Sequence, residues 1–248
     1  MTGRVHQALK IAGICIPVIV LIPVAAWSSA PAVFSAAFNV TPLRIELNSQ
    51  VQFSTFQIRN NSSERLALQA RGFAWSQQDS MDRFAPTTDV AISPSIVEIA
   101  PGETQHFKLL RRQVQSGPAE NAYRLIIDQL PDQRAPQAGA TATRLRVSIP
   151  VFVNRNVAAP ARLGWSINGT AISLSNAGGR SVKFSKLAIA TPDGQLHGLA
   201  LKGAQYVLSG ASATWAMPDT LSCFPSGSFV TGIVDNGPLR EPIPQSCG

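Results

Sequence analysis

The residues of this chain that could do covalent or metal chemistry are few and far apart. Its 248 residues include three cysteines and three histidines. Past the N-terminal segment only His106 and His197 remain, and neither lies in a recognisable catalytic triad motif. No Cys-x-x-Cys spacing occurs, so a metal site is not expected. No P-loop occurs either, so we expect a protein that is not an enzyme, needs no cofactor and acts through binding alone.

One run, Arg144–Val153, has a pattern suited to binding. Apolar residues alternate along it, which predicts a β-strand with one apolar face. Pro150 lies within the run and cannot donate to a ladder, which predicts an edge strand. A long edge strand of branched apolar residues is an aggregation hazard unless it is covered. We therefore expect it to be given to another protein; the alternative is that this face packs into the protein's own core. The alternating residues are Leu145, Val147, Ile149, Val151 and Val153.

The chain begins with the features of a targeting segment. Basic residues precede the apolar run Ile11–Trp27, and small residues at 35–37 suit a signal peptidase. We expect cleavage before Phe38, so that residues 1–37 form a signal peptide and the mature chain is exported. The alternative is an uncleaved membrane anchor, because the apolar run approaches the length that spans a bilayer.

Export decides how the cysteines are interpreted. Once Cys15 has left with the signal peptide, Cys223 and Cys247 form an even pair in an oxidising compartment. This predicts a disulfide between them, with two free thiols as the alternative.

Composition narrows the class of protein further. Charged residues make up only 14% of the chain, which suits a β-sandwich with Ser-, Thr- and Gln-rich outer faces. The net charge of +7 comes from scattered basic residues, without a Lys/Arg run or an aromatic–basic motif. Nucleic acid is therefore not an expected partner.

Short strand-like runs separated by Asn, Ser, Pro and Gly follow Phe38, and no segment has convincing helical periodicity. About seven such runs within a hundred residues or so are typical of an immunoglobulin-like sandwich. A short linker at Asn154–Ala161 separates them from a second set. We predict an all-β chain of two immunoglobulin-like β-sandwich domains joined by this linker, over residues 38–155 and 156–248. The predicted strands are 40–48, 51–60, 66–75, 96–103, 106–112, 122–130 and 144–153, then 163–168, 170–176, 181–190, 205–210, 213–218 and 228–235.

These segments resemble periplasmic chaperones of the chaperone–usher pathway, the family that folds pilus subunits. The resemblance covers essentially the whole exported chain, and the SIPVFV ending is similar to the archaic, spore-coat-U-associated branch. It implies a periplasmic location, pilus or fimbrial subunits and an outer-membrane usher as partners, and leaves open self-association of the unliganded protein through its edge strand. The segments that carry it are 42–47, Ser93–Leu109, Glu120–Pro131 and Ser148–Val153.

The resemblance also implies roles for individual residues. The donated strand would fill the groove of a subunit that lacks its last strand, which is β-augmentation. Arg44 corresponds to the arginine that grips the subunit's terminal carboxylate, although a lone strand arginine is usually just solvated. The family's second cleft cation is a lysine at the position of Pro150. Arg124 is expected across from Pro150 and would replace this lysine, with Arg146 and Arg112 as weaker candidates. The inserted side chains would be Thr143, Leu145, Val147 and Ile149.

An interdomain ion-pair cluster is a further feature that the resemblance implies. Glu120 and Asp235 match its acidic members, whereas Asn154 stands at the arginine position with Arg155 next to it. Because a one-residue offset turns a side chain to the other face of a strand, the arginine of the cluster stays undecided.

An exported β-sandwich adhesin or a pilus structural subunit is the alternative function. A subunit would be one domain with a donor extension at its N-terminus. This chain is instead expected to have two domains, with its long alternating strand in the middle. The sequence therefore favours a chaperone that binds subunits and delivers them to an usher.

Overall fold

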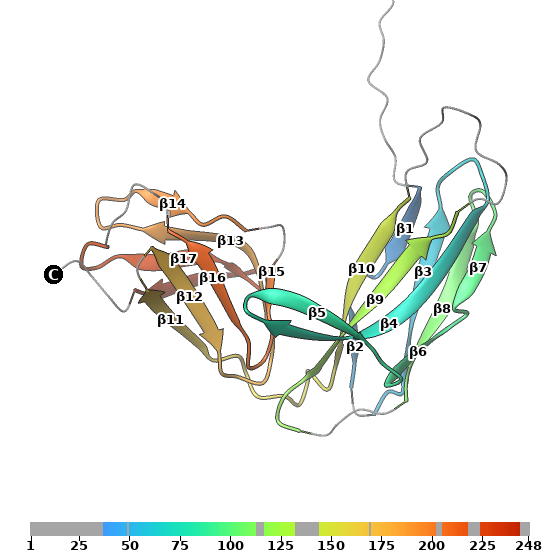
Figure 1. Ribbon diagram of the computed structural model, residues 1–248, viewed down its shortest axis with the longest axis horizontal. Helices are drawn as coiled ribbons and strands as arrows, with labels where there is room; N and C mark the ends of the chain where they lie inside the picture. The colour runs from blue at the N-terminus through green and yellow to red at the C-terminus, as the bar shows by residue number, and fades with distance from the viewer. Residues whose placement is uncertain are drawn as a thin grey trace, which may run out of the picture. The chain divides into compact units, whose positions relative to one another are not determined.

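All regular elements in the described part of the chain are β-strands (Figure 1). This confirms the all-β prediction. Among these residues no helix has the length and apolar character needed to cross a membrane. The computed structural model describes residues 37–48, 50–112, 117–131, 144–168, 170–201, 205–217 and 224–243, which all fall in one compact unit.

The first sandwich consists of two sheets. One has the strand order β1-β3-β8-β6, and the other has the order β2-β10-β9-β4-β5, with β7 also pairing with β4. The bounds are β1 Phe38–Thr41, β2 Ile45–Leu47, β3 Phe53–Asn60, β4 Leu66–Gln78, β5 Met81–Pro86, β6 Val90–Ser93, β7 Ile96–Ile99, β8 Thr104–Arg111, β9 Asn121–Gln129 and β10 Arg146–Val153.

The first predicted strand, residues 40–48, is divided into two in the structure. β1 pairs with β3 in one sheet, whereas β2 pairs with β10 in the other. Pro42 lies at the break, where it cannot donate a hydrogen bond to either ladder. The chain therefore changes sheets within a few residues, and this places Arg44 immediately before β2.

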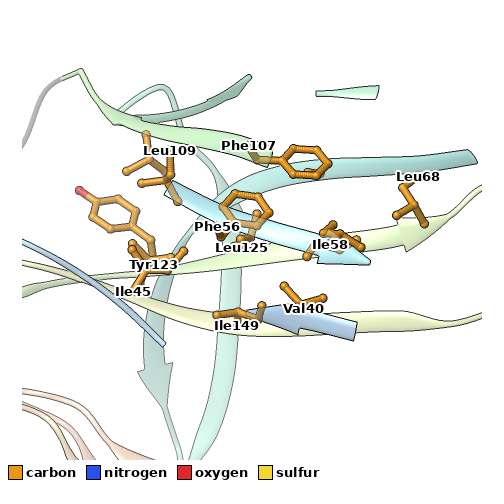
Figure 2. Packing of buried hydrophobic residues seen from close by; sticks show 14 of the residues in the cluster. Val40, Ile45, Phe56, Ile58, Leu68, Phe107, Leu109, Tyr123, Leu125 and Ile149 are labelled. Atoms are coloured by element: carbon orange, nitrogen blue, oxygen red, sulfur yellow. The ribbon is translucent and has the colours of Figure 1, made fainter. Parts of the chain in front are cut away.

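The core of the first sandwich lies between its two sheets. The rings of Phe56 on β3 and Phe107 on β8 are stacked with centroids 4.8 Å apart. Aliphatic residues of β9 and β10 pack around them, among them Leu125 and Ile149 (Figure 2). Of these residues, Ile149 belongs to the alternating apolar face that the sequence predicted.

The second sandwich also has two sheets. They have the orders β11-β12-β16 and β14-β13-β17-β18, and β15 pairs with β13. An aromatic group of Trp165, Phe184 and Trp215 lies in the core. The bounds are β11 Leu163–Asn168, β12 Ala171–Asn176, β13 Val182–Ala190, β14 Leu196–Gly198, β15 Gln205–Val207, β16 Ser212–Ala216, β17 Phe229–Val234 and β18 Gly237–Pro242.

Four strands, β5, β6, β14 and β18, had no counterpart among the predicted runs. Every residue of β5 is exposed, so it has no apolar alternation to detect. β18 contains Pro238 and Pro242 and lies at the end of its sheet. An edge position suits these prolines, because they cannot donate to a ladder.

Candidate functional site

Half of β10 is an edge strand. β10 pairs antiparallel with β9 along its whole length, but its other side pairs with β2 only at Val151–Val153. No strand in the described part of the chain pairs with the second side of Arg146–Pro150. The edge position that Pro150 predicted is therefore confirmed for this half of the strand.

The hydrogen bonds at the two ends of β10 show which way its backbone groups point. The Gln129 N–H donates to the Leu145 carbonyl over 3.0 Å, so the odd-numbered residues bond to β9. The Asn154 N–H donates to the Leu47 carbonyl over 2.8 Å, so the even-numbered residues face the β2 side. Arg146 and Ser148 thus direct their backbone N–H and C=O groups outward. The missing N–H of Pro150 falls on the same side, where no ladder bond is lost.

The apolar side chains of β10 are not equally available. Leu145 and Val147 are half-buried at the rim of the first core, whereas Ile149 is 1% exposed and packed within it. Ile149 therefore packs in the protein's own core, and its insertion into a partner stays a prediction. Its side chain lies in the same core cluster as Val40 of β1 and Ile45 of β2 (Figure 2). Thr143, the fourth predicted residue, lies outside the described residues.

Arg44 lines a pocket of about 360 Å³. Its guanidinium pairs with Glu46 and lies 5.1 Å from the centre of the Phe152 ring. The Arg44 Nε is buried and has no hydrogen-bond partner within the described residues. Lys183, from β13, lines the same pocket, so a second cation that the sequence had not singled out lies near Arg44.

Arg124 lies directly opposite Pro150, as predicted. Its guanidinium is 3.7 Å from the centre of the Trp75 ring, and its Nη2 is 3.8 Å from Oδ2 of Asp82. Burial lowers the pKa of Arg124, and the Asp82 carboxylate opposes this effect. The Nε of Arg124 is also buried without a partner within the described residues.

Three aromatic rings connect these arginines. Trp75, Phe152 and Tyr206 have ring centroids 5.4 to 6.0 Å apart. Arg44 lies over Phe152, and Arg124 lies over Trp75 and within 5.7 Å of Tyr206. Burial raises the pKa of Tyr206, and the neighbouring arginines oppose this. Sequence reasoning missed this aromatic cluster, because single aromatic residues on distant strands give no local signal.

The two predicted acids of the ion-pair cluster meet at Arg155. Arg155 Nη1 donates to Glu120 Oε2 over 2.6 Å, and Arg155 Nη2 donates to Asp235 Oδ2 over 3.5 Å. The other oxygen of Glu120 accepts a hydrogen bond from the Ser181 N–H over 2.6 Å. Asn154 adopts a φ of 63°, a left-handed conformation that ends the strand and redirects the chain. The arginine left undecided by the sequence is therefore Arg155.

Cys223 and Cys247, together with nearly all of the predicted signal peptide, lie outside the described residues. Among the described residues no cluster of His, Cys, Asp and Glu could hold a metal ion.

Residues 37–156 match the family model of the pili and flagellar-assembly chaperone, PapD N-terminal domain. No curated protein sequence matches the chain. Residues 37–156 therefore belong to this chaperone family, which confirms the class of protein that the sequence predicted.

Solved structures share the fold of the chain beyond the matched segment. One is the CsuC–CsuE chaperone–tip adhesion subunit pre-assembly complex from archaic chaperone-usher Csu pili of Acinetobacter baumannii, with 22% identity, a TM-score of 0.63 and coverage of 84% of this chain and 97% of the other. The CupB2 chaperone of Pseudomonas aeruginosa has 13% identity, a TM-score of 0.58 and coverage of 83% and 100%. The SafA pilin–SafB chaperone complex of Salmonella enterica has 15% identity, a TM-score of 0.59 and coverage of 86% and 99%.

These structures confirm the predicted fold of two β-sandwich domains. They do not favour the alternative function as an adhesin or pilus subunit, because the chaperone fold extends over most of the chain.

Proposed function

We propose that the chain is a periplasmic chaperone that binds a pilus subunit by lending it the outer edge of β10. The observation that carries this proposal is the unpaired side of Arg146–Pro150 in the described part of the chain. Two residues there, Arg146 and Ser148, direct backbone donors and acceptors outward, which is what an added strand needs for β-augmentation.

The side chains at this edge support the same function. Leu145 and Val147 sit at the rim of the core, half-buried, so a subunit with an open groove could complete their burial. Full burial of one branched aliphatic side chain is worth roughly 1.5–3 kcal/mol. The two together would supply a large share of the holding energy before the costs of association are subtracted. We keep Thr143 as a further inserted residue.

Arg44 and Arg124 are proposed as the anchor for the subunit's terminal carboxylate. A guanidinium can hold a carboxylate through two parallel hydrogen bonds, and each of these two has a buried Nε without a partner within the described residues. Arg44 shares its pocket with Lys183, which would add positive charge. Arg124 lies beside Pro150 on the same sheet, so the anchor and the donated edge would act on one bound subunit.

The remaining parts of the proposal concern the setting. The complexes of related folds contain a tip adhesion subunit or a pilin. We propose that this chain likewise takes pilus subunits, is exported by cleavage of residues 1–37, and passes its subunits to an outer-membrane usher. It would act without catalysis or ATP, because binding energy alone drives strand donation.

Co-purification from the periplasm tests the proposal. Tagged wild-type protein should bring down a small β-rich subunit, and that subunit should be degraded or aggregate in a strain that lacks the chaperone. Stable accumulation of the subunit in the deletion strain would contradict the chaperone function.

A further inference from the structure

Asp128 binds two guanidinium groups at the end of β10 where pairing with β9 begins. Arg146, the first residue of β10, lies directly opposite Asp128 and donates from Nε to Oδ1. Arg71 on β4 donates from Nη2 to Oδ2 over 2.6 Å. The Asp128 side chain is 14% exposed, whereas those of Arg71 and Arg146 are 44% and 66% exposed. One carboxylate therefore links three neighbouring strands, β4, β9 and β10.

The ionised form of Asp128 is favoured in this arrangement. Burial raises the pKa of Asp128, but the hydrogen bonds from Arg71 and Arg146 lower it by more, so it lies below its ordinary value. The link between the strands is thus present at neutral pH, when the carboxylate can accept from both arginines.

This end of β10 has a partner strand on one side only within the described residues. Val151–Val153 are paired on both sides and buried, whereas Arg146–Pro150 are paired with β9 alone within the described residues. A strand segment with one partner opens more readily than one with two. A slip of one residue would turn Leu145 and Val147 to the opposite face of the sheet.

We propose that Asp128 is a positioning residue for the donated strand. By binding Arg146 and Arg71 it holds the first half of β10 in register on β9, so that Leu145 and Val147 are already ordered when a subunit arrives. Ordering before binding removes part of the cost of association. Its effect on capture rests on the proposed function, whereas the restraint on β10 exists without any subunit.

Amide hydrogen exchange of the full chain, without a subunit, tests the restraint. The Val147 N–H faces β9, and we expect Asp128→Asn to make it exchange about two- to fivefold faster than in the wild type, the range for loss of a partly exposed ion pair. Glu98→Gln, which removes an exposed carboxylate from β7 of the same sheet, should leave the exchange rate of the Val147 amide unchanged. Because salt screens the ion pairs, about 1 M salt should bring the Val147 exchange rate of the wild type close to that of Asp128→Asn.

Arg146→Gln gives a second route to the same answer. The Arg146 side chain is largely exposed, so this variant should fold even if Asp128→Asn folds poorly. It breaks the same bond to Asp128. It too should speed exchange at Val147, and the Leu125 amide in the core should not change. Val147 exchange equal to the wild type in both variants would overturn the proposal.

Capture of the subunit separates this proposal from the proposed function. Asp128→Asn should slow capture by about the same two- to fivefold. Faster Val147 exchange with capture at the wild-type rate would overturn the positioning role. Failure of the wild type to capture any subunit, with faster exchange in the variant, would overturn the proposed function and leave the restraint on β10 standing.

Discussion

Glu120 is a buried carboxylate that depends on Arg155 for its charge balance. Its side chain is 1% exposed, and Arg155 donates to it over 2.6 Å. Arg155→Ala should lower the free energy of unfolding by about 3–5 kcal/mol, because it leaves a buried charge without its partner. Urea unfolding followed by circular dichroism measures this change. Arg59→Ala, at an exposed position on β3, is the control, and an Arg155→Ala effect as small as that of the control would contradict the assignment.

The two anchor arginines carry a prediction about binding. Arg44→Ala and Arg124→Ala should each weaken the complex with the subunit by about 1.5–3 kcal/mol, the value of a hydrogen bond to a charged group. Titration calorimetry with the purified subunit measures the loss. Arg59→Ala is again the matched control, since it removes an exposed guanidinium from β3, a strand of the other sheet. Normal subunit recovery with the Arg44→Ala/Arg124→Ala double variant would remove both residues from the anchor.

Three positions on β10 separate donation from core packing. Leu145→Asp and Val147→Asp should abolish capture and leave the protein folded, because the charge stays at the rim until a subunit buries it. Ile149→Asp, on the same face, should unfold the first sandwich, because Ile149 is 1% exposed. Circular dichroism and co-purification are the two measurements. Unfolding by Leu145→Asp or Val147→Asp would place that residue in the internal core.

β10 also shows what sequence could and could not predict. Alternation and Pro150 predicted the strand and its edge position, because both depend on local backbone chemistry. The burial of Ile149 depends on residues far away in the sequence, among them Val40 of β1 and Ile45 of β2, which belong to the same core cluster. Alternation cannot show which residues of an apolar face such neighbours bury, so the sequence grouped Ile149 with Leu145 and Val147.

The positions of Arg124 and Arg155 illustrate the same limit for side chains. The register between β9 and β10 was predictable because, in a hairpin-like antiparallel pair, each step along one strand matches one step back along the other. Arg124 was therefore expected opposite Pro150, where it lies. The change from Asn154 to Arg155 was not, because it follows from the left-handed φ of Asn154. Likewise Trp75 and Tyr206 meet only through the tertiary fold.

At the scale of the whole molecule, the disulfide between Cys223 and Cys247 stays a prediction. In the loop-entropy model such a cross-link would add about 3 kcal/mol to the free energy of unfolding. Mass spectrometry of the non-reduced mature protein should find no alkylatable thiol, and reduction should release two. Two thiols in the non-reduced protein would show that no bridge forms. The same spectra would fix the N-terminus, which we expect at Phe38.

The most direct test of strand donation is residue-resolved amide exchange at β10, with and without the bound subunit. Arg146 and Ser148 direct their N–H groups to the unpaired side, so both should exchange readily in the free protein and slow by at least about 100-fold in the complex. The amides of Val147 and Ile149 face β9 and should be protected in both states. A stable complex in which Arg146 and Ser148 exchange as fast as in the free protein would contradict the account.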